Sequence, residues 1–371
     1  MTGATSVTQL MHAFGDGGTN VAEGYPRFAF TPTQRSIVER LPRMMLDAQA
    51  TPFAALEANA QWALLLGLGQ RTAPVGTGRI MSYYAAGVAI DIVGRVLAAR
   101  TGTVAVIHPT LDCMPALIHS RGPRVVPISE ARLRRRDPLA DFEPVGGLYI
   151  ANPNNPSGGV LDPDHLRRLA ESCARRNVAL AIDACFRAFD LEAQYDMYEV
   201  LDATGVDYVV IEDTGKLWPL GGVRLAFLAF PEHSTLGIPE ASADLLMNAP
   251  PFAALVVEAF ARDMADGGLA VIQERLAANR AILRDALAGS PAELADGHSK
   301  VSMSLIRMPK GLPSTRLWGR LLRRGVHAVP GRPIWWARPR EGERYLRIAL
   351  AREPEVIEAA GREIRAELDA A

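Results

Sequence analysis

Residues 147–158 read GLYIANPNNPSG, a short apolar run that ends abruptly in polar and turn-forming residues. Two similar runs follow: VALAI at 178–182 ends in Asp183, and DYVVI at 207–211 ends in EDTGK at 212–216. Apolar runs of this length are typical of strands that are buried on both faces of a parallel sheet. Because ligands bind beyond the carboxyl ends of such strands, the polar residues after each run are candidates for a functional site.

Helical patterns separate these and other apolar runs in the middle of the chain. We predict helices at 88–99, 114–120 and 163–176, and strands at 103–107, 124–128, 147–151, 178–182, 207–211 and 223–230. Strands that alternate with helices need crossover connections, which favour a mostly parallel sheet covered on both faces. The alternation therefore predicts a large α/β domain.

The two ends of the chain have a different rhythm. Helical patterns occupy 33–48 and 52–68 near the start and 240–247, 252–264 and 268–289 later on. Strands are then expected at 301–308, 326–329 and 345–349, before a closing helix from Glu353. Residues 1–31 have little periodicity and fit either a disordered tail or an ordered arm. We predict an N-terminal arm or lid with part of the small domain at 1–48, a large domain at 49–240 and a small α+β domain at 241–371.

The composition excludes several classes of protein. Of the 371 residues, 49% are hydrophobic and 22% charged, which excludes disordered and disulfide-scaffold classes. A net charge of -1 offers no basic surface for nucleic acid or an anionic membrane. The longest apolar runs fall short of the roughly 20 residues that cross a bilayer. Three cysteines without C-x-x-C spacing favour neither disulfides nor a metal site, so we expect a cytoplasmic protein whose partners are small molecules or other subunits.

Each strand-end residue has an ordinary explanation when it is taken alone. Asn, Pro, Ser and Gly are common in turns, Asp183 could cap a helix, and a lysine after a glycine is usually solvated. Together, a lysine, an aspartate and an amide at neighbouring strand ends are what a pyridoxal phosphate enzyme requires. The lysine forms a Schiff base with the cofactor aldehyde, and the aspartate keeps the pyridine nitrogen protonated so that the ring accepts electrons.

From about residue 50 onward the sequence resembles the class I and II aminotransferases, which are pyridoxal phosphate enzymes of fold type I. NPNNPSG matches the family's Asn-Pro-x-Asn-Pro-Thr/Ser-Gly and implies that Asn155 binds the ring hydroxyl. AIDACF implies that Asp183 binds the pyridine nitrogen, and DTGKLWPLGGVRLA implies Lys216 as the Schiff-base lysine and Arg224 as a phosphate ligand. RYLRIALA implies that Arg347 binds the substrate carboxylate. The resemblance also implies a seven-stranded, mostly parallel sheet, a smaller α+β domain and a homodimer.

The sequence departs from the family pattern around the cofactor. Ala85, Ala86 and Gly87 stand where relatives have hydroxyl side chains at the helix N-terminus that receives the phosphate. Backbone N–H groups and the helix dipole can still bind a phosphate there. Leu111 stands where an aromatic ring normally stacks on the cofactor, and Cys185 precedes a Phe that replaces the usual Tyr near the ring hydroxyl.

Asp213, three residues before Lys216, replaces a phosphate-binding Ser of many relatives. Because a phosphate dianion would repel a carboxylate, we expect Asp213 to face the substrate. The stretches VIEDTGKLW, RDMADGGLA and AVPGRPIWWARP resemble the oxygen-using L-arginine oxidases and hydroxylases of antibiotic pathways. That resemblance implies that Asp213 binds a guanidinium and that residues 9–31 form a lid. The lid motif's Asp and His read Glu23 and Tyr25 here, which we predict to contact the substrate.

The predicted function is therefore oxygen-dependent oxidation, hydroxylation or desaturation of L-arginine or an arginine derivative. Lys216 would remove the Cα proton, and Asp183 would stabilise the resulting quinonoid. Ordinary transamination and cyclisation of hydroxyarginine to a capreomycidine-like ring are the alternative reactions. A binding module without turnover would predict loss of Lys216 or Asp183, and both residues are present.

Overall fold

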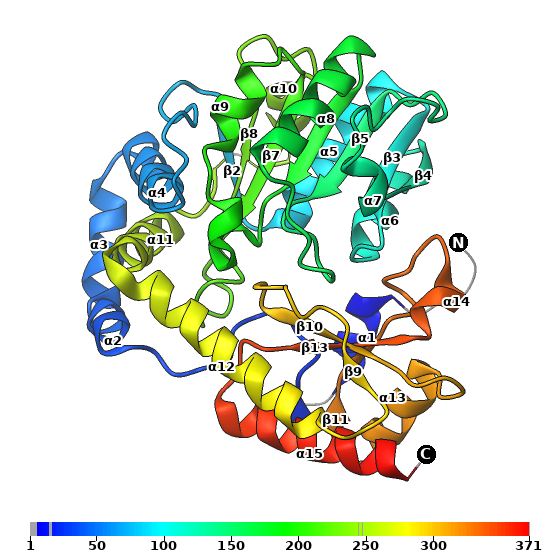
Figure 1. Ribbon diagram of the computed structural model, residues 1–371. Coiled ribbons are helices and arrows are strands. Elements are labelled where there is room, and N and C mark those ends of the chain that lie inside the picture. Colours follow the sequence, from blue (N-terminus) through cyan, green and yellow to red (C-terminus); the bar gives the residue numbers. More distant parts are fainter. Residues whose placement is uncertain (1–5, 15–16, 244, 247, 371) are drawn as a thin grey trace.

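The computed structural model describes residues 6–370, apart from residues 15–16, 244 and 247. Two sheets lie at opposite ends of the molecule in Figure 1, the larger drawn in cyan and green and the smaller in orange. Within the described part of the chain, no helix is both long and apolar enough to span a membrane.

The larger sheet has seven strands in the order β2-β8-β7-β6-β5-β3-β4. β8 runs in the opposite direction to the other six strands of this sheet, so the predicted mostly parallel sheet is confirmed. All residues of β5, β6, β7 and β8 are buried, which explains their unbroken apolar runs. The bounds are β2 Ile80–Tyr83, β3 Thr103–His108, β4 Arg124–Ser129, β5 Gly147–Ala151, β6 Ala179–Asp183, β7 Tyr208–Asp213 and β8 Ala226–Ala229.

Helices connect and cover the strands of this sheet (Figure 1). Asp162 caps the N-terminus of α8 by accepting the backbone N–H of His165, and Pro163 occupies the first turn. The helices are α5 Ala86–Arg100, α6 Cys113–His119, α7 Glu130–Leu133, α8 Pro163–Arg175, α9 Met197–Asp202 and α10 Ile238–Ala243, with 3₁₀ turns η1 Arg187–Phe189 and η2 Leu191–Ala193. Strand β2 was missed by the sequence analysis because it has only four residues after a turn-rich stretch.

The predicted helix at 33–48 is wrong in one respect, because two helices occupy this stretch. α2 Pro32–Glu39 ends at Arg40, and α3 Leu41–Ala50 begins directly after it. Pro42 in the first turn of α3 has no backbone N–H to continue α2, which accounts for the break. Both helices and α4 Phe53–Gly67 pack against α11 Pro251–Asp263. Residues Met264–Gly268 join α11 to the long helix α12 Leu269–Leu287 through a kink, at which Asp266 and Gly267 leave the helical conformation.

The smaller sheet is antiparallel, in the order β12-β13-β10-β9. The predicted strand at 326–329 is divided in two, since β11 and β12 belong to different sheets on either side of Ala328. The bounds are β9 Glu293–Leu294, β10 Met303–Arg307, β11 Val326–His327, β12 Val329–Pro330 and β13 Tyr345–Ala349, with helices α13 Ser314–Arg323, α14 Pro339–Gly342 and α15 Pro354–Asp369.

The N-terminal residues that the structure describes form an ordered arm on the small sheet, rather than a tail. α1 Val7–Ala13 starts with a capping box between Ser6 and Gln9. β1 Thr19–Asn20 pairs in parallel with β11. Val7 and Ala22 are buried in a small apolar cluster with residues of the C-terminal region. Residues 1–5 and 15–16, which belong to the predicted N-terminal arm, lie outside the described part of the chain. The predicted domain boundaries stay predictions.

Candidate active site

The sheet register brings three of the predicted residues to one edge. Ala151 at the end of β5 pairs with Asp183 at the end of β6, and Asp183 pairs with Ile211 of β7. Asn155 follows β5 by four residues, and Lys216 follows the end of β7 by three. The parallel strands therefore place an amide, a carboxylate and an amine beyond the same edge of the sheet.

Asp183 is a buried carboxylate with partners for both oxygens. The hydroxyl of Tyr149 donates to Oδ2 at 3.2 Å, and the backbone N–H of Cys185 donates to Oδ1 at 3.0 Å. Burial raises the pKa of Asp183, while these hydrogen bonds and the charge of Lys216 oppose the rise. The Cys185 thiol is also buried, and burial raises its pKa well above the ordinary value. The hydrogen bond of Cys185 to Asp183 comes from its backbone N–H.

Lys216 sits in a turn that is fastened to the next strand. The hydroxyl of Thr214 donates to the Leu225 carbonyl at 3.1 Å and accepts the Leu225 N–H at 2.9 Å. The Lys216 Nζ atom lies 4.4 Å from the centroid of the Tyr25 ring, in a cation–π contact. The N-terminal arm therefore reaches the predicted catalytic lysine.

Asp213 ends β7 and is only 6% exposed. Burial raises the pKa of Asp213, while the charge of Lys216 and the nearby backbone N–H groups of Gly215 and Thr214 oppose the rise. Its Oδ1 atom has no hydrogen-bond partner within the described residues. A Cβ atom on Gly215 would lie 3.1 Å from Asp213 Oδ2 and 2.8 Å from Arg224 Cδ, so the absence of a side chain there lets both groups pack closely.

Arg224 lies close to the start of α5. Tyr83 at the end of β2 pairs with Ala226 at the start of β8, and the Arg224 guanidinium lies 5.3 Å from the ring centroid of Tyr84, two residues before α5 begins. Ala85 caps α5 without a side-chain hydrogen bond, and a Cβ atom on Gly87 would meet open space. The Arg224 guanidinium lies 4.8 Å from the Tyr25 ring centroid and donates to the Tyr25 hydroxyl. A helix N-terminus and an arginine are thus brought together, as a phosphate site requires.

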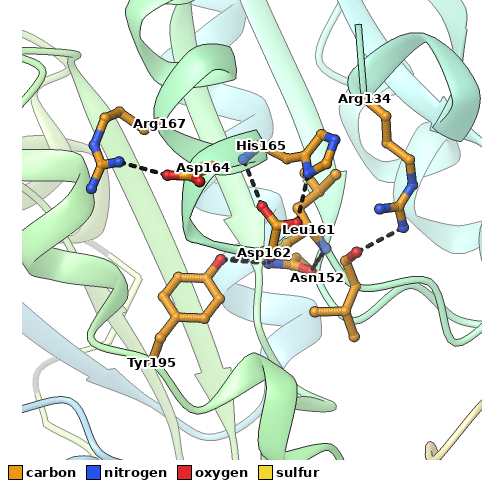
Figure 2. Close-up of polar contacts among 9 residues, drawn as sticks. Arg134, Asn152, Leu161, Asp162, Asp164, His165, Arg167 and Tyr195 are labelled. Atoms are coloured by element: carbon orange, nitrogen blue, oxygen red, sulfur yellow. Dashed lines mark hydrogen bonds and ion pairs between the residues drawn. The ribbon is translucent and has the colours of Figure 1, made fainter.

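The loop that carries Asn155 is held at its base by Asn152 (Figure 2). The Asn152 side chain accepts the Leu161 N–H at 2.8 Å and donates to the Tyr195 hydroxyl at 3.3 Å. The Tyr195 hydroxyl in turn donates to the Leu161 carbonyl at 2.8 Å. Asn155 is buried, yet its Oδ1 atom has no partner in the part of the chain that the structure describes.

Arg347 approaches the site from the small sheet. It lies on β13 opposite Leu305 and Val329, and it is 2% exposed. Its Nη2 atom donates to the Ala22 carbonyl at 2.8 Å, whereas its Nε atom has no partner among the described residues. Burial lowers the pKa of Arg347 to about 10, which still leaves the guanidinium charged at neutral pH.

The other predicted residues differ in how they reach the site. Leu111 is half-buried and packs against both apolar clusters. Glu23 forms an ion pair with Arg27 at 2.6 Å, and the described contacts do not join it to Asp213. A cavity of about 690 Å³ lies beside Tyr25; its lining includes Glu23, Arg27, Trp218 and Arg224. The structure thus brings Tyr25 to Lys216 and Arg224, and places Glu23 on the cavity wall.

Sequence reasoning missed three groups. Tyr149 could have been found from strand alternation, because it lies two residues before the end of β5. Ala22 contributes only its carbonyl oxygen, for which side-chain patterns give no signal. Arg352 donates to the carbonyls of Asn20, Glu23 and Tyr25, and a second arginine five residues after Arg347 in an apolar run was a usable signal.

The unpartnered buried atoms indicate whether pyridoxal phosphate fits this site. Buried polar atoms are nearly always hydrogen-bonded, so those of Asn155, Arg224 and Arg347 are suited to a ligand. Asn155 would meet the ring hydroxyl, Asp183 the ring nitrogen, and Arg224 with the start of α5 the phosphate. The cofactor, when bound, supplies an electron sink for the substrate carbon that carries the amino group.

The comparisons with known proteins support this fit. The family model for "Aminotransferase class I and II" matches residues 54–364. Histidinol-phosphate aminotransferase of Paramagnetospirillum magneticum is 35% identical over 86 residues, 23% of each chain. Valine–pyruvate aminotransferase of Mycobacterium tuberculosis is 26% identical over 193 residues, 50% of this chain and 48% of the relative. The chain therefore spans half or less of the length of these two curated relatives.

Solved structures resemble almost the whole chain, and one of them is also clearly similar in sequence. It is a structure of MppP soaked with the product 2-ketoarginine, with a TM-score of 0.91 and 37% identity over 94% of this chain and 99% of that chain. The predicted fold type I architecture and the predicted resemblance are both confirmed. This chain belongs to the class I and II aminotransferase family, and its cofactor is pyridoxal 5'-phosphate.

Proposed function

We propose that this pyridoxal phosphate enzyme acts on L-arginine or an arginine derivative and uses dioxygen to oxidise, hydroxylate or desaturate it. The observation that carries the proposal is Asp213, a buried carboxylate beside Lys216 whose Oδ1 atom accepts no hydrogen bond from any described residue. A guanidinium offers two parallel charged hydrogen bonds to such a carboxylate. The likeness to MppP, whose structure was soaked with 2-ketoarginine, supports the same substrate class.

The proposed roles follow from where the side chains lie. Arg347 binds the substrate carboxylate through its free Nε atom, and Asp213 binds the guanidinium at the other end of the substrate. Lys216, which faces the part of the substrate between these two contacts, takes up and returns the Cα proton. Asp183, with Tyr149 and Cys185 as its donors, stays fixed where it meets the ring nitrogen. The two charged contacts orient the substrate across the lysine.

The N-terminal arm supports a reaction that needs protection from water. Tyr25 covers the Lys216 amine, and Gly24 packs against the lysine side chain, with an added Cβ atom 3.4 Å from Lys216 Cε. Dioxygen chemistry requires that the reactive substrate is not hydrolysed early, and a covered site excludes the water that would do this. The cover is therefore consistent with the oxygen-using route.

Ordinary transamination is the second candidate. The family membership and the curated aminotransferase relatives favour it, because Asn155, Asp183, Lys216 and Arg347 serve either reaction. Cyclisation of hydroxyarginine would use the same groups. These reactions differ in what happens to the substrate after proton removal, which the positions of these four side chains do not decide.

We also propose a homodimer in a reducing compartment. Met45, Leu46, Trp62 and Leu66 on α3 and α4 are each at least 40% exposed. Large exposed apolar side chains on two neighbouring helices favour a subunit interface. Cys113, Cys173 and Cys185 are all free thiols, which is typical of a reducing environment.

An oxygen electrode separates the two reactions. Purified holoenzyme is given L-arginine, L-leucine or L-glutamate, and a parallel assay measures glutamate formation from L-arginine with 2-oxoglutarate. Oxygen uptake with L-arginine alone supports the proposal. Transamination without oxygen uptake, or a preference for the aliphatic or acidic amino acid, contradicts it. Lys216→Ala is the matched control for adventitious oxidation.

A further inference from the structure

Arg352 follows β13 and is 1% exposed, although it carries a charge that is costly to bury. Buried arginines usually pair with a carboxylate. Arg352 instead donates to backbone carbonyls within the described chain: Nε to Asn20 at 2.6 Å, Nη2 to Glu23 at 2.6 Å, and Nη1 to Tyr25 at 2.7 Å and Ala351 at 2.8 Å. The Arg352 guanidinium is therefore bound by backbone carbonyl groups.

Three of these four acceptors belong to one short stretch, residues 20–25. One planar guanidinium thus fixes the start, the middle and the end of this stretch, because its donors have a rigid geometry. Backbone hydrogen bonds also join this part of the chain to the end of β13 and the residues after it. The Ala349 N–H donates to the Val21 carbonyl at 2.7 Å, and the Arg27 N–H donates to the Ala351 carbonyl at 2.9 Å. Among the described side chains, only Arg352 donates hydrogen bonds to backbone carbonyls on both sides of Ala22.

The opposite side of residues 20–25 faces the candidate active site. The Ala22 carbonyl accepts a hydrogen bond from Arg347. A Cβ atom on Gly24 would lie 3.0 Å from Met303 Cε and 3.4 Å from Lys216 Cε, so this glycine packs directly on the lysine. The Tyr25 ring covers the Lys216 amine. The segment that Arg352 holds is the one that meets the carboxylate-binding arginine and the lysine.

We propose that Arg352 is a positioning residue for substrate binding. It holds residues 20–25 so that Ala22 orients the Arg347 guanidinium and Gly24 and Tyr25 cover Lys216. The inference rests on the proposed function only in taking Arg347 and Lys216 as the groups that bind the substrate. It does not depend on which amino acid is bound or on whether dioxygen is used.

The competing role for Arg352 is general stabilisation of the core. That role predicts only that the variant has a lower melting temperature. The protein that remains folded should behave like the wild type. A positioning role predicts, in addition, a more accessible N-terminal segment and weaker substrate binding. These two properties are measured separately from the stability.

The test compares Arg352→Lys and Arg352→Met holoenzymes with the wild type. Trypsin cleavage after Arg27, followed by mass spectrometry, reports how firmly residues 20–27 are held. The substrate dissociation constant is titrated through the absorbance of the bound cofactor, with an amino acid that the wild type accepts. We expect both the cleavage rate and the dissociation constant to rise by at least about tenfold, the effect of losing one hydrogen bond to a charged group.

Arg275→Lys is the matched control. Arg275 also touches the N-terminal arm, with its guanidinium 4.4 Å from the Phe28 ring and 3.7 Å from Glu353, but it does not donate to residues 20–25. Both readouts should stay at the wild-type value in this variant. A folded Arg352 variant with only a lower melting temperature overturns the proposal.

Hydrogen exchange in the wild type keeps the proposal testable if neither Arg352 variant folds. Amides of residues 20–25 should be protected together with those of 347–352, because they open as one unit. Rapid exchange of residues 20–25 in otherwise protected protein overturns the proposal, and shared protection supports it. Cleavage after Arg27 does not require turnover, so failure of the arginine hypothesis leaves this result unaffected.

Discussion

The two sides of the candidate active site are built in different ways. On the large-domain side, Asn155, Asp183 and Lys216 follow adjacent strands, and the register of a buried sheet brings them together. On the opposite side, Arg347 meets residues 20–25 through a backbone carbonyl, and the two partners are 325 residues apart in sequence. The side chains of the first side are positioned by the register of the large sheet. The arginine of the second side contacts a short N-terminal segment, which Arg352 holds by hydrogen bonds.

This difference suggests how the chemistry and the choice of substrate are separated. Side chains at the ends of packed strands are held more rigidly than those of a connecting segment. We therefore expect changes on the sheet side to remove the reaction, and changes on the arm side to alter how tightly a substrate binds. Substitutions at four positions test this separation, beginning with the position expected to have the largest effect.

Lys216→Ala should remove turnover while leaving the fold intact. A positioned acid–base group contributes about 10²- to 10⁴-fold to a rate, so kcat should fall by at least that much. Borohydride should attach the cofactor to Lys216 in the wild type and to no residue in the variant, as peptide mass spectrometry would show. A variant that keeps most of its kcat would contradict the division between the two sides.

Arg347→Ala should chiefly weaken substrate binding. The lost charge-assisted contact is worth roughly 1.5 to 3 kcal/mol, or more in a dry site, so apparent affinity should fall at least tenfold. Arg347→Lys should recover it only in part, because an ammonium cannot make the planar two-point contact. The dissociation constant and kcat should be measured separately. Unchanged affinity in Arg347→Ala would mean that this arginine serves only the Ala22 carbonyl.

Asp213→Asn tests whether an acid on the sheet side also selects the substrate. Asparagine keeps one acceptor oxygen but loses the charge, so L-arginine binding should weaken by about 1.5 kcal/mol, near the lower limit for a charged hydrogen bond. Cofactor content, read from its absorbance, should not change. Loss of the cofactor in this variant would assign Asp213 to the phosphate end of the site and remove the main support for a guanidinium substrate.

Tyr25→Phe should have the smallest effect. It removes the hydroxyl that accepts from Arg224 but keeps the ring over Lys216. Because Tyr25 is partly exposed, the cost in cofactor affinity should be about 1 kcal/mol or less. Tyr25→Ala, which also removes the ring, is the paired variant and should weaken substrate binding further. Equal values for the two variants would show that the ring provides no cover.

The sheet side could be predicted from sequence because its signals are local. The apolar runs 147–151, 178–182 and 207–211 predicted both the strands and the edge at which the polar side chains after them meet. The same reasoning overlooked β2, whose four residues are too few for a periodic pattern. It also joined α2 to α3, because the apolar spacing continues across the break that Pro42 causes.

The arm side could not be predicted in the same way. The contact of Ala22 with Arg347 uses a carbonyl oxygen that every residue has, and the position of Glu23 depends on its ion pair with Arg27. The resemblance to a known family suggested that residues 9–31 form a lid, but it did not indicate which atoms hold this lid in place. Contacts between distant backbone and side-chain groups leave no periodic pattern in a sequence.

The parallel pairing of β1 with β11 has a consequence for the order of folding. Within the described chain, the backbone hydrogen bonds that tie residues 19–25 to distant residues all lead to residues 325–352, so during synthesis they can form only after residue 352 has left the ribosome. The strands of the large sheet are complete by residue 229 and can pair before then. Contacts of such long sequence separation form late because the loop they close is entropically costly. We therefore expect the chain to assemble its cofactor-binding edge before residues 19–25 cover it, which would leave an interval in which the cofactor can enter.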